Sequence, residues 1–401
     1  MQAADRLAAE HPLLRVSIRA EDNGTHPAFA RSSQHIPVCT VRGSGAQWER
    51  FVDEQELITP IDWRCGPLIR ILDVVGGDAP HETHDLVLTV SHVIADGSTA
   101  LMLLQRLVVH AHRLTSGSIE NAGVPRPVIA APEDFLPERY RGTRCIARLA
   151  VTGVADGLVT ALVRPRRLAP EALVHPRRRR SRLVRRTLTS TQLNGLVDRC
   201  RRKGVTVHGA LTAAMAMVIG PTAAQSASGR ICIGSPVNFR AELNPPVSDD
   251  VAGSYVNTVP TIVSFGGDRD LWSVAHQVNR SLDRRRRYGQ HLASLWAMRF
   301  ICPRSLATSS TAFGFVERNG PLNVAISNLG RYEFAERIGD WQLSGAQFVS
   351  GVPQTGSFLA SVNTSHGELF WNFSYAEGVV SPRSAHRFAD GCLDTLLSAL
   401  A

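Results

Sequence analysis

The sequence lacks several features that would assign it to other classes of protein. It has no apolar run of the roughly 20 residues that a bilayer-spanning helix needs, and its longest apolar stretch covers residues 209–220. Its N-terminus shows no basic segment followed by an apolar one, the pattern of a secretory signal. We therefore expect no transmembrane segment, and we expect the protein in the cytoplasm.

Pairs of cysteines are also missing. The seven cysteines are scattered and odd in number, and none has the spacing of a metal-binding pair. This usage fits a reducing compartment, where disulfides are rare. The histidines do not cluster with carboxylates or cysteines, and we expect His110, His112 and His208 on helix surfaces or at helix starts. We predict no metal site and no bound cofactor.

The composition, 44% hydrophobic and 20% charged over 401 residues, is that of a globular protein with room for two cores. The net charge is +9, with ten arginines between Arg164 and Arg186 and four more at Arg284–Arg287. Such runs are commonly a solvated connector and a polar helix end. The alternative is a docking surface for an acidic or phosphorylated partner, because arginine binds such groups through paired donors. No nucleic-acid module is present, so we expect no nucleic-acid partner.

Strand-like and helix-like segments alternate in both halves of the chain, which predicts an α/β protein of two lobes. In the first half we expect helices at 2–11 and 98–114 and strands at 13–19, 68–75 and 85–90. Residues 125–176 are rich in proline and arginine and suggest a connector. We place the first lobe at 1–163, an arginine-rich linker at 164–186 and the second lobe at 187–401.

The second half continues the alternation. A helix capped at Ser190 or Thr191 should end at Gly204, a residue suited to a left-handed turn. The other expected helices are 208–218, 271–287, 293–300 and 381–400, and the expected strands are 183–188, 230–235, 257–264, 321–327, 357–363 and 369–375.

The most informative motif is His92-Val93-Ile94-Ala95-Asp96-Gly97, which lies between a strand-like run and a helix-like run. It places a histidine, a carboxylate and a glycine at a turn, where a base can be fixed and still reach a substrate. Taken alone, the pattern His-x-x-x-Asp-Gly recurs by chance. The segments that accompany it therefore decide its meaning.

Taken with this motif, several segments resemble the condensation-domain and chloramphenicol-acetyltransferase-like superfamily. They are EHPLLR (10–15), PIDWRCGPLIR (60–70), GVTVH (204–208), PVNFR (236–240) and ISNLGR (326–331). The resemblance spans nearly the whole chain and implies two chloramphenicol-acetyltransferase-like α/β sandwiches with an active-site tunnel between the lobes. Relatives usually carry one more strand before the first helix, so either the first lobe lacks an edge strand or the start codon has been assigned late.

The resemblance also implies a role for each residue of the motif. His92 would be the general base, taking a proton from an acceptor that attacks a thioester and returning it to the departing thiolate, a role worth on the order of 10² to 10⁴ in rate. Asp96 would turn away from the substrate and pair with Arg240, fixing the turn that carries His92. Gly97 would leave room for the backbone turn or for the approach of a donor.

Ser327 and Asn328 end a predicted strand at a place where relatives bring polar groups to the tunnel. Each could donate a hydrogen bond to the oxyanion formed at a thioester carbonyl. The alternative is that Ser-Asn-Leu-Gly forms an ordinary turn. No serine-elbow sequence supports a covalent acyl-enzyme.

Departures from the superfamily narrow the expected activity. Ser91 stands where peptide-synthetase condensation domains usually carry a first histidine, and the Asp-Phe-Gly-Trp-Gly signature of plant-type acyltransferases is missing. The chain is most similar to stand-alone polyketide-associated acyltransferases, of the phthiocerol dimycocerosyl transferase type, and to alcohol acetyltransferases.

This similarity implies transfer of an acyl group from a coenzyme A or phosphopantetheinyl acyl carrier protein thioester to a hydroxyl of a natural product or lipid. The arginine runs would then be candidates for docking an acidic carrier protein or the coenzyme A phosphates. A free-standing condensation enzyme that forms an amide and a noncatalytic docking module of the same fold remain the alternatives.

Overall fold

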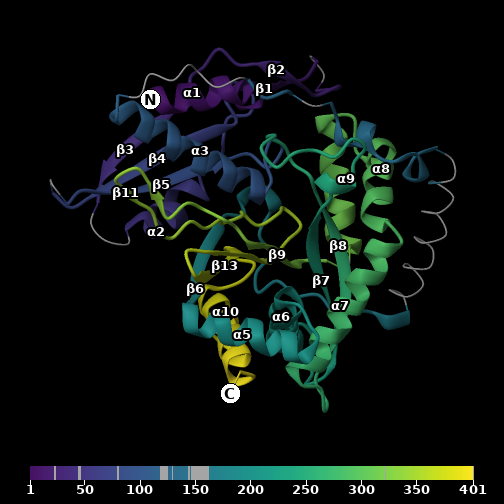
Figure 1. Cartoon of the computed structure of the whole chain (residues 1–401). Coiled ribbons are helices and arrows are strands. Elements are labelled where there is room, and N and C mark those ends of the chain that lie inside the picture. The colour runs from purple at the N-terminus through teal and green to yellow at the C-terminus, as the bar shows by residue number, and fades with distance from the viewer. Residues whose placement is uncertain are drawn as a thin grey trace.

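The computed structural model describes residues 1–21, 24–43, 47–78, 81–117, 125–128, 130–142, 145, 162–320 and 322–400. Within these residues the chain builds two lobes, each around its own sheet, as the alternation of strands and helices predicts. One sheet has three strands and the other has six. Figure 1 shows the smaller lobe with the N-terminus at the upper left and the larger lobe below and to the right.

The first lobe packs two helices against the three-stranded sheet. Its strands are β3 (Val38–Arg42), β4 (Ile69–Gly76) and β5 (Thr83–Val90), with β4 parallel to β3 and antiparallel to β5. The helices α1 (Gln2–Glu10) and α3 (Gly97–Thr115) bury leucines such as Leu7 and Leu103 in one core. The expected helices and the strands β4 and β5 are therefore present.

Three parts of the first lobe differ from the sequence prediction. Residues Pro12–Arg15 form a 3-10 turn, so the strand predicted from residue 13 is only β1 (Val16–Arg19). It pairs with the short β2 (Ala28–Arg31). The short β2 and β3 and the helix α2 (Gln47–Phe51), which continues as η2 (Val52–Glu56), were not predicted because they are too short to show a clear period.

The second lobe is a six-stranded mixed sheet in the order β6-β13-β12-β9-β7-β8. Its strands are β6 (Ser181–Leu188), β7 (Gly229–Asn238), β8 (Val256–Phe265), β9 (Val324–Arg331), β12 (Phe358–Ser365) and β13 (Glu368–Ala376). Its main helices are α5 (Ser190–Lys203), α6 (Val207–Ala224), α7 (Leu271–Arg287) and α10 (Pro382–Ser398). A separate two-stranded ribbon joins β10 (Arg337–Ile338) to β11 (Trp341–Gln342).

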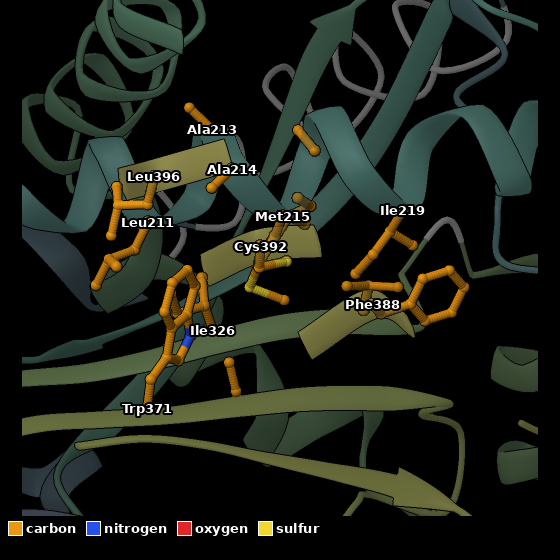
Figure 2. Packing of buried hydrophobic residues seen from close by; sticks show 14 of the residues in the cluster. Leu211, Ala213, Ala214, Met215, Ile219, Ile326, Trp371, Phe388, Cys392 and Leu396 are labelled. Atoms are coloured by element: carbon orange, nitrogen blue, oxygen red, sulfur yellow. The ribbon is translucent and has the colours of Figure 1, made fainter. Parts of the chain in front are cut away.

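The core of this lobe lies between the sheet and two helices. Figure 2 shows side chains of α6 and α10 above the sheet residues Ile326 and Trp371. In the part of the chain that the structure describes, α6 is the one helix long and apolar enough to cross a bilayer. It is mostly buried between α7, α10 and the sheet, and a helix that is apolar all round and packed on all sides is a core helix.

The predicted cap of α5 was wrong by one residue or more. Thr189 is the N-cap: its hydroxyl accepts from the Gln192 N–H, and the Gln192 side chain accepts from the Thr189 N–H, which makes a complete capping box. The helix ends at Gly204 in the left-handed conformation, φ +65°, as expected. The start of a helix is set by which hydroxyl reaches its free N–H groups, and three hydroxyl residues in a row offer that choice here.

The predicted linker 164–186 was wrong for its last six residues, which form most of β6 and pair with β13. Four arginines of this run bind carboxylates instead of standing in solvent: Arg179 with Glu317, Arg182 with Asp53, Arg185 with Glu49 and Arg186 with Asp390. Two of these carboxylates belong to the first lobe, so the run ties the lobes together. The predicted connector 125–176 lies partly outside the described residues, and η3 (Pro132–Phe135) and η4 (Glu138–Tyr140) lie in its described part.

Two further helices, α8 (Gln290–Ile301) and α9 (Leu306–Asn319), follow α7. The sequence predicted the first of them and missed α9, whose apolar residues follow no clear helical stripe. Figure 1 shows the two helices side by side at the outer right edge of the molecule.

Candidate functional site

His92 lies on a tight turn between β5 and α3. The turn is closed by the Ile94 N–H, which donates to the Ser91 carbonyl at 3.0 Å, and the His92 side chain is exposed. Its Nδ1 lies 3.4 Å from the Ser254 hydroxyl of the second lobe. Among the described residues no hydrogen bond to its Nε2 is recorded. The imidazole is thus oriented through one nitrogen while the other remains available to a substrate.

Asp96 is buried and faces away from His92, into the contact between the lobes. It is the N-cap of α3: one carboxylate oxygen accepts from the Thr99 N–H at 2.8 Å, and the other accepts from the Tyr255 N–H at 2.9 Å. Its own N–H donates to the Gly253 carbonyl at 3.1 Å. A carboxylate engaged by two backbone donors is held in place and serves to fix the turn.

Arg240 approaches the same carboxylate but binds mainly to its surroundings. Its Nη2 lies 3.7 Å from Asp96 Oδ2, which is ion-pair distance without a hydrogen bond, and donates to the Thr99 hydroxyl at 2.6 Å. Its Nη1 donates to the carbonyls of Ser248 and Val251 at 3.1 and 2.8 Å. The guanidinium therefore holds the loop that leads to Ser254 as well as the start of α3.

The ring of Tyr255 completes this buried cluster. The Arg240 guanidinium lies over it at 4.2 Å from the ring centre, and the ring contacts Phe239 edge to face. Burial raises the pKa of the Tyr255 phenol, and the Asp96 carboxylate adds to the rise while Arg240 opposes it. The cluster is apolar and tightly packed on the side away from His92, which keeps the turn rigid.

Gly97 is needed for a close approach between the lobes. A Cβ atom at this position would lie 3.1 Å from the Phe348 ring and 3.2 Å from Leu329 Cδ1. Its backbone is helical and does not need a glycine, so the turn itself sets no requirement here. Leu329 belongs to β9, and this contact brings the end of β9 against the start of α3.

Ser327 and Asn328 therefore lie on the strand whose end meets the His92 motif. Ser327 is half-buried and pairs in register with Ser361 of β12. The Asn328 carbonyl oxygen accepts from the Gly330 N–H at 2.8 Å, as in a local turn, and Gly330 has φ +73°. The Asn328 side chain keeps its two N–H donors, because the turn uses only its oxygen.

Sequence reasoning missed the residues that connect these elements. Ser254 and Thr99 bind the motif directly, while Phe348 sets the space above Gly97. A serine, a threonine or a phenylalanine in a loop carries no local signal of a contact made across more than a hundred residues. The histidines were also placed imperfectly: His110 is buried and binds Glu10 at 2.8 Å, although we expected it on a surface.

A cavity of about 530 Å³ lies elsewhere, at the start of β7, and its lining includes Arg164, Arg166, Arg230 and Arg269. Arg240 follows the other end of the same strand, so ten strand residues separate the two places. This cavity is not part of the His92 site.

The site and the two-lobed fold can now be compared with known proteins. A family model described as "phthiocerol/phthiodiolone dimycocerosyl transferase C-terminus" matches residues 177–336. Among solved structures, the epimerization domain from the third module of tyrocidine synthetase B aligns with a TM-score of 0.70 and 16% identity, covering 100% of this chain and 87% of that one. The chain has the condensation-domain fold. A search of curated proteins found no significant match.

Two other condensation-like structures support this assignment. The first condensation domain of the CDA synthetase gives a TM-score of 0.69 at 14% identity, covering 100% of this chain and 86% of that one. Polyketide synthase associated protein 5 from Mycobacterium tuberculosis gives 0.61 at 16% identity, covering 99% and 88%. The resemblance to the condensation-domain and chloramphenicol-acetyltransferase-like superfamily is confirmed. These neighbours include an epimerization domain as well as a condensation domain, so the fold by itself does not decide the reaction.

Proposed function

We propose that this condensation-domain-like protein is an acyltransferase that moves an acyl group from a thioester to a hydroxyl. The observation that supports this most is the state of the His92 turn. The buried cluster of Asp96, Arg240 and Tyr255 holds the turn, while the imidazole of His92 stands exposed at its tip. A fixed turn that presents a titratable ring suits a general base.

In the proposed reaction His92 Nε2 takes the proton of the acceptor hydroxyl as its oxygen attacks the thioester carbonyl. The C–O bond forms, the carbonyl oxygen becomes an oxyanion, and the side chains of Ser327 and Asn328 donate hydrogen bonds to it. When the C–S bond breaks, the imidazolium returns its proton to the thiolate. Ester and thiol leave, and the histidine is neutral again, so no acyl-enzyme is required.

The donor in this proposal is acyl-coenzyme A or an acyl carrier protein, and the protein acts in the cytoplasm. The arginines of β6 are engaged with carboxylates of this chain and are not free to bind a donor. The exposed Arg177, Arg178 and Arg180 have no ion pair among the described residues and could meet an acidic carrier or phosphate groups.

The test compares wild type with His92→Ala for acceptor-dependent thiol release from a panel of acyl-coenzyme A and acyl-carrier donors, with mass spectrometry of the product. His386→Ala, at an exposed position on α10, is the matched control. We expect the His92 variant to lose 10² to 10⁴ in rate and the control to keep its activity.

The product mass separates the alternatives. An ester supports the proposal, whereas an amide assigns the chain as a free-standing condensation enzyme. Turnover that is unchanged in His92→Ala removes His92 from catalysis, and carrier binding without any turnover favours the noncatalytic docking module.

A further inference from the structure

The exposed apolar side chains of this protein are concentrated on one pair of helices. Among the described residues fourteen large hydrophobic side chains are exposed, and eight of them lie between residues 288 and 316. These eight are Tyr288, Met298, Phe300, Ile301, Leu306, Phe313, Phe315 and Val316. Single exposed apolar residues are ordinary, but a concentration of this kind marks a binding surface. We call these eight residues the α8–α9 face.

The helix α9 is not held by an apolar core. None of its described side chains is buried. Its start is bound by backbone hydrogen bonds to the first lobe, from the Leu306 N–H to the Gly24 carbonyl at 3.0 Å and from the His26 N–H to the Arg304 carbonyl at 3.2 Å. Its end is bound through Glu317, which pairs with Arg179 of the second lobe. A surface helix normally turns its apolar side inward, so the apolar side chains of α9 have no partner in the described part of the chain.

The outermost residues of this face are at the turn between the helices and along α9. Ile301 is 72% exposed, Phe315 is 62% exposed and Phe300 is 61% exposed. Two of the three are aromatic, and all three stand on the outer edge seen in Figure 1. A projecting apolar edge suits insertion into a soft apolar layer better than it suits a rigid partner, which would have to offer a matching groove.

The charges around the face are mostly positive. Residues 283–318 contain seven arginines and only two acidic residues, Asp283 and Glu317. Glu317 is neutralised by Arg179, while Arg304 and Arg318 beside the apolar residues form no ion pair among the described residues. Exposed apolar side chains flanked by arginines match the chemistry of an anionic lipid surface, where the rings enter the acyl boundary and the cations meet the headgroups.

We propose that the α8–α9 face docks the protein on an anionic lipid bilayer. The protein would lie on the membrane surface without crossing it, since the face consists of side chains on two surface helices. This inference does not depend on the proposed acyl transfer, and binding can be measured without turnover.

The test is cosedimentation of the full chain with vesicles of phosphatidylcholine, with and without phosphatidylglycerol. The variant replaces three residues of the face, Phe300→Ser, Ile301→Ser and Phe315→Ser. Leu173→Ser is the matched control, because Leu173 is 95% exposed and lies outside the face. We expect wild type and the control to bind the anionic vesicles, with binding weakened by salt. We expect the triple variant to bind at least about tenfold more weakly, since each apolar side chain removed is worth more than a kilocalorie per mole on burial.

Each other outcome overturns the proposal. Wild type that sediments with neither vesicle, or a triple variant that binds as tightly as wild type, excludes docking through this face. Sedimentation velocity without lipid tests the other occupant: a concentration-dependent dimer that the triple variant loses would mean that a second copy of the chain covers the face. Circular dichroism checks that all variants fold, and thiol release from soluble donors shows separately whether the proposed activity stands.

Discussion

The backbone N–H of Tyr255 donates a hydrogen bond to Oδ2 of Asp96 at 2.9 Å, across 159 residues of sequence. This bond joins the turn that carries His92 to the segment that begins β8 in the second lobe. The carboxylate is completely buried, so water cannot replace either of its backbone donors. The position of His92 relative to the second lobe therefore depends on the charge state and geometry of Asp96.

Replacing Asp96 by asparagine should weaken the fold as well as the activity. The amide NH₂ group would face the Tyr255 N–H or the Thr99 N–H, and Arg240 would lose its only nearby carboxylate among the described residues. Breaking a buried pair in this way typically costs 3 to 5 kcal/mol. Urea unfolding should show a loss of roughly that size, and thiol release should fall with it.

The control for this variant is Asp198→Asn, at an exposed ion pair on α5 that should be worth less than about 1 kcal/mol. A variant Asp96→Asn of unchanged stability that has lost its activity would instead make Asp96 a participant in the reaction.

The Gly97→Ala variant should report the contact between the lobes. The added methyl would stand 3.1 Å from the Phe348 ring, so the ring must move by a few tenths of an ångström. Overpacking of this kind costs about 1 to 3 kcal/mol, against up to about 1 kcal/mol gained because alanine favours a helix. We expect a small net loss of stability and a clear loss of activity.

A double-mutant cycle with Phe348→Leu tests that explanation. The smaller side chain leaves room for the methyl, so Gly97→Ala should cost less in the Phe348→Leu background than in wild type, by 0.5 kcal/mol or more. Equal costs in both backgrounds would show that Phe348 does not limit this position.

The sequence predicted the local elements of the site better than its contacts. The turn at His92 and the helix after Gly97 follow from a change of hydrophobic period, from strand to helix, that is written in neighbouring residues. The approach of Arg240 to Asp96 came only from the family resemblance. That Arg240 donates to Thr99, and that Tyr255 binds Asp96 through its N–H, depends on the packing of the two lobes, which no local pattern encodes.

The arginine run shows the same limit from the other side. As a sequence, residues 179–186 resemble a solvated linker because charge dominates their composition. In the structure the strand β6 is stabilised by pairing with β13, and the carboxylates that neutralise its arginines come from distant segments, among them Glu49 and Asp53. Charge composition thus indicated the wrong structure because the partners were invisible.

The Asp53→Ala variant should loosen the connection between the lobes. Asp53 accepts from the Arg182 guanidinium, at 2.6 Å from Nη2, and from the Leu183 N–H at 2.6 Å. Hydrogen bonds to charged groups contribute about 1.5 to 3 kcal/mol each, and this pair is partly buried. We expect the free energy of unfolding to fall by about 2 kcal/mol in urea.

Glu54→Ala is the neighbouring control. Glu54 binds Arg50 one helical turn away on an exposed surface, and such pairs are worth about 0.3 to 0.5 kcal/mol. If the two variants lose the same amount, the contact between Asp53 and Arg182 does not hold the lobes together.

His208 should make the stability of the second lobe sensitive to acid. Its imidazole lies at the start of α6, with Nε2 3.0 Å from the Ser235 hydroxyl, and burial lowers the pKa of His208 from 6.5 to about 4. In the unfolded chain the ring takes up a proton below pH 6.5, whereas in the folded protein it stays neutral until about pH 4. Its contribution is therefore fully present above pH 6.5 and is lost as the pH falls toward 4. Over that window the loss amounts to at most about 3 kcal/mol. We expect His208→Gln to be less stable than wild type at neutral pH, because the packing of the ring is lost, but to lose less stability on acidification. Urea unfolding of both proteins at several pH values between 7 and 4, flagged here as an approximate window around the two pKa values, measures the difference directly. Parallel curves for wild type and variant would show that another group, such as the buried His11, whose pKa is also lowered by burial, governs the acid response.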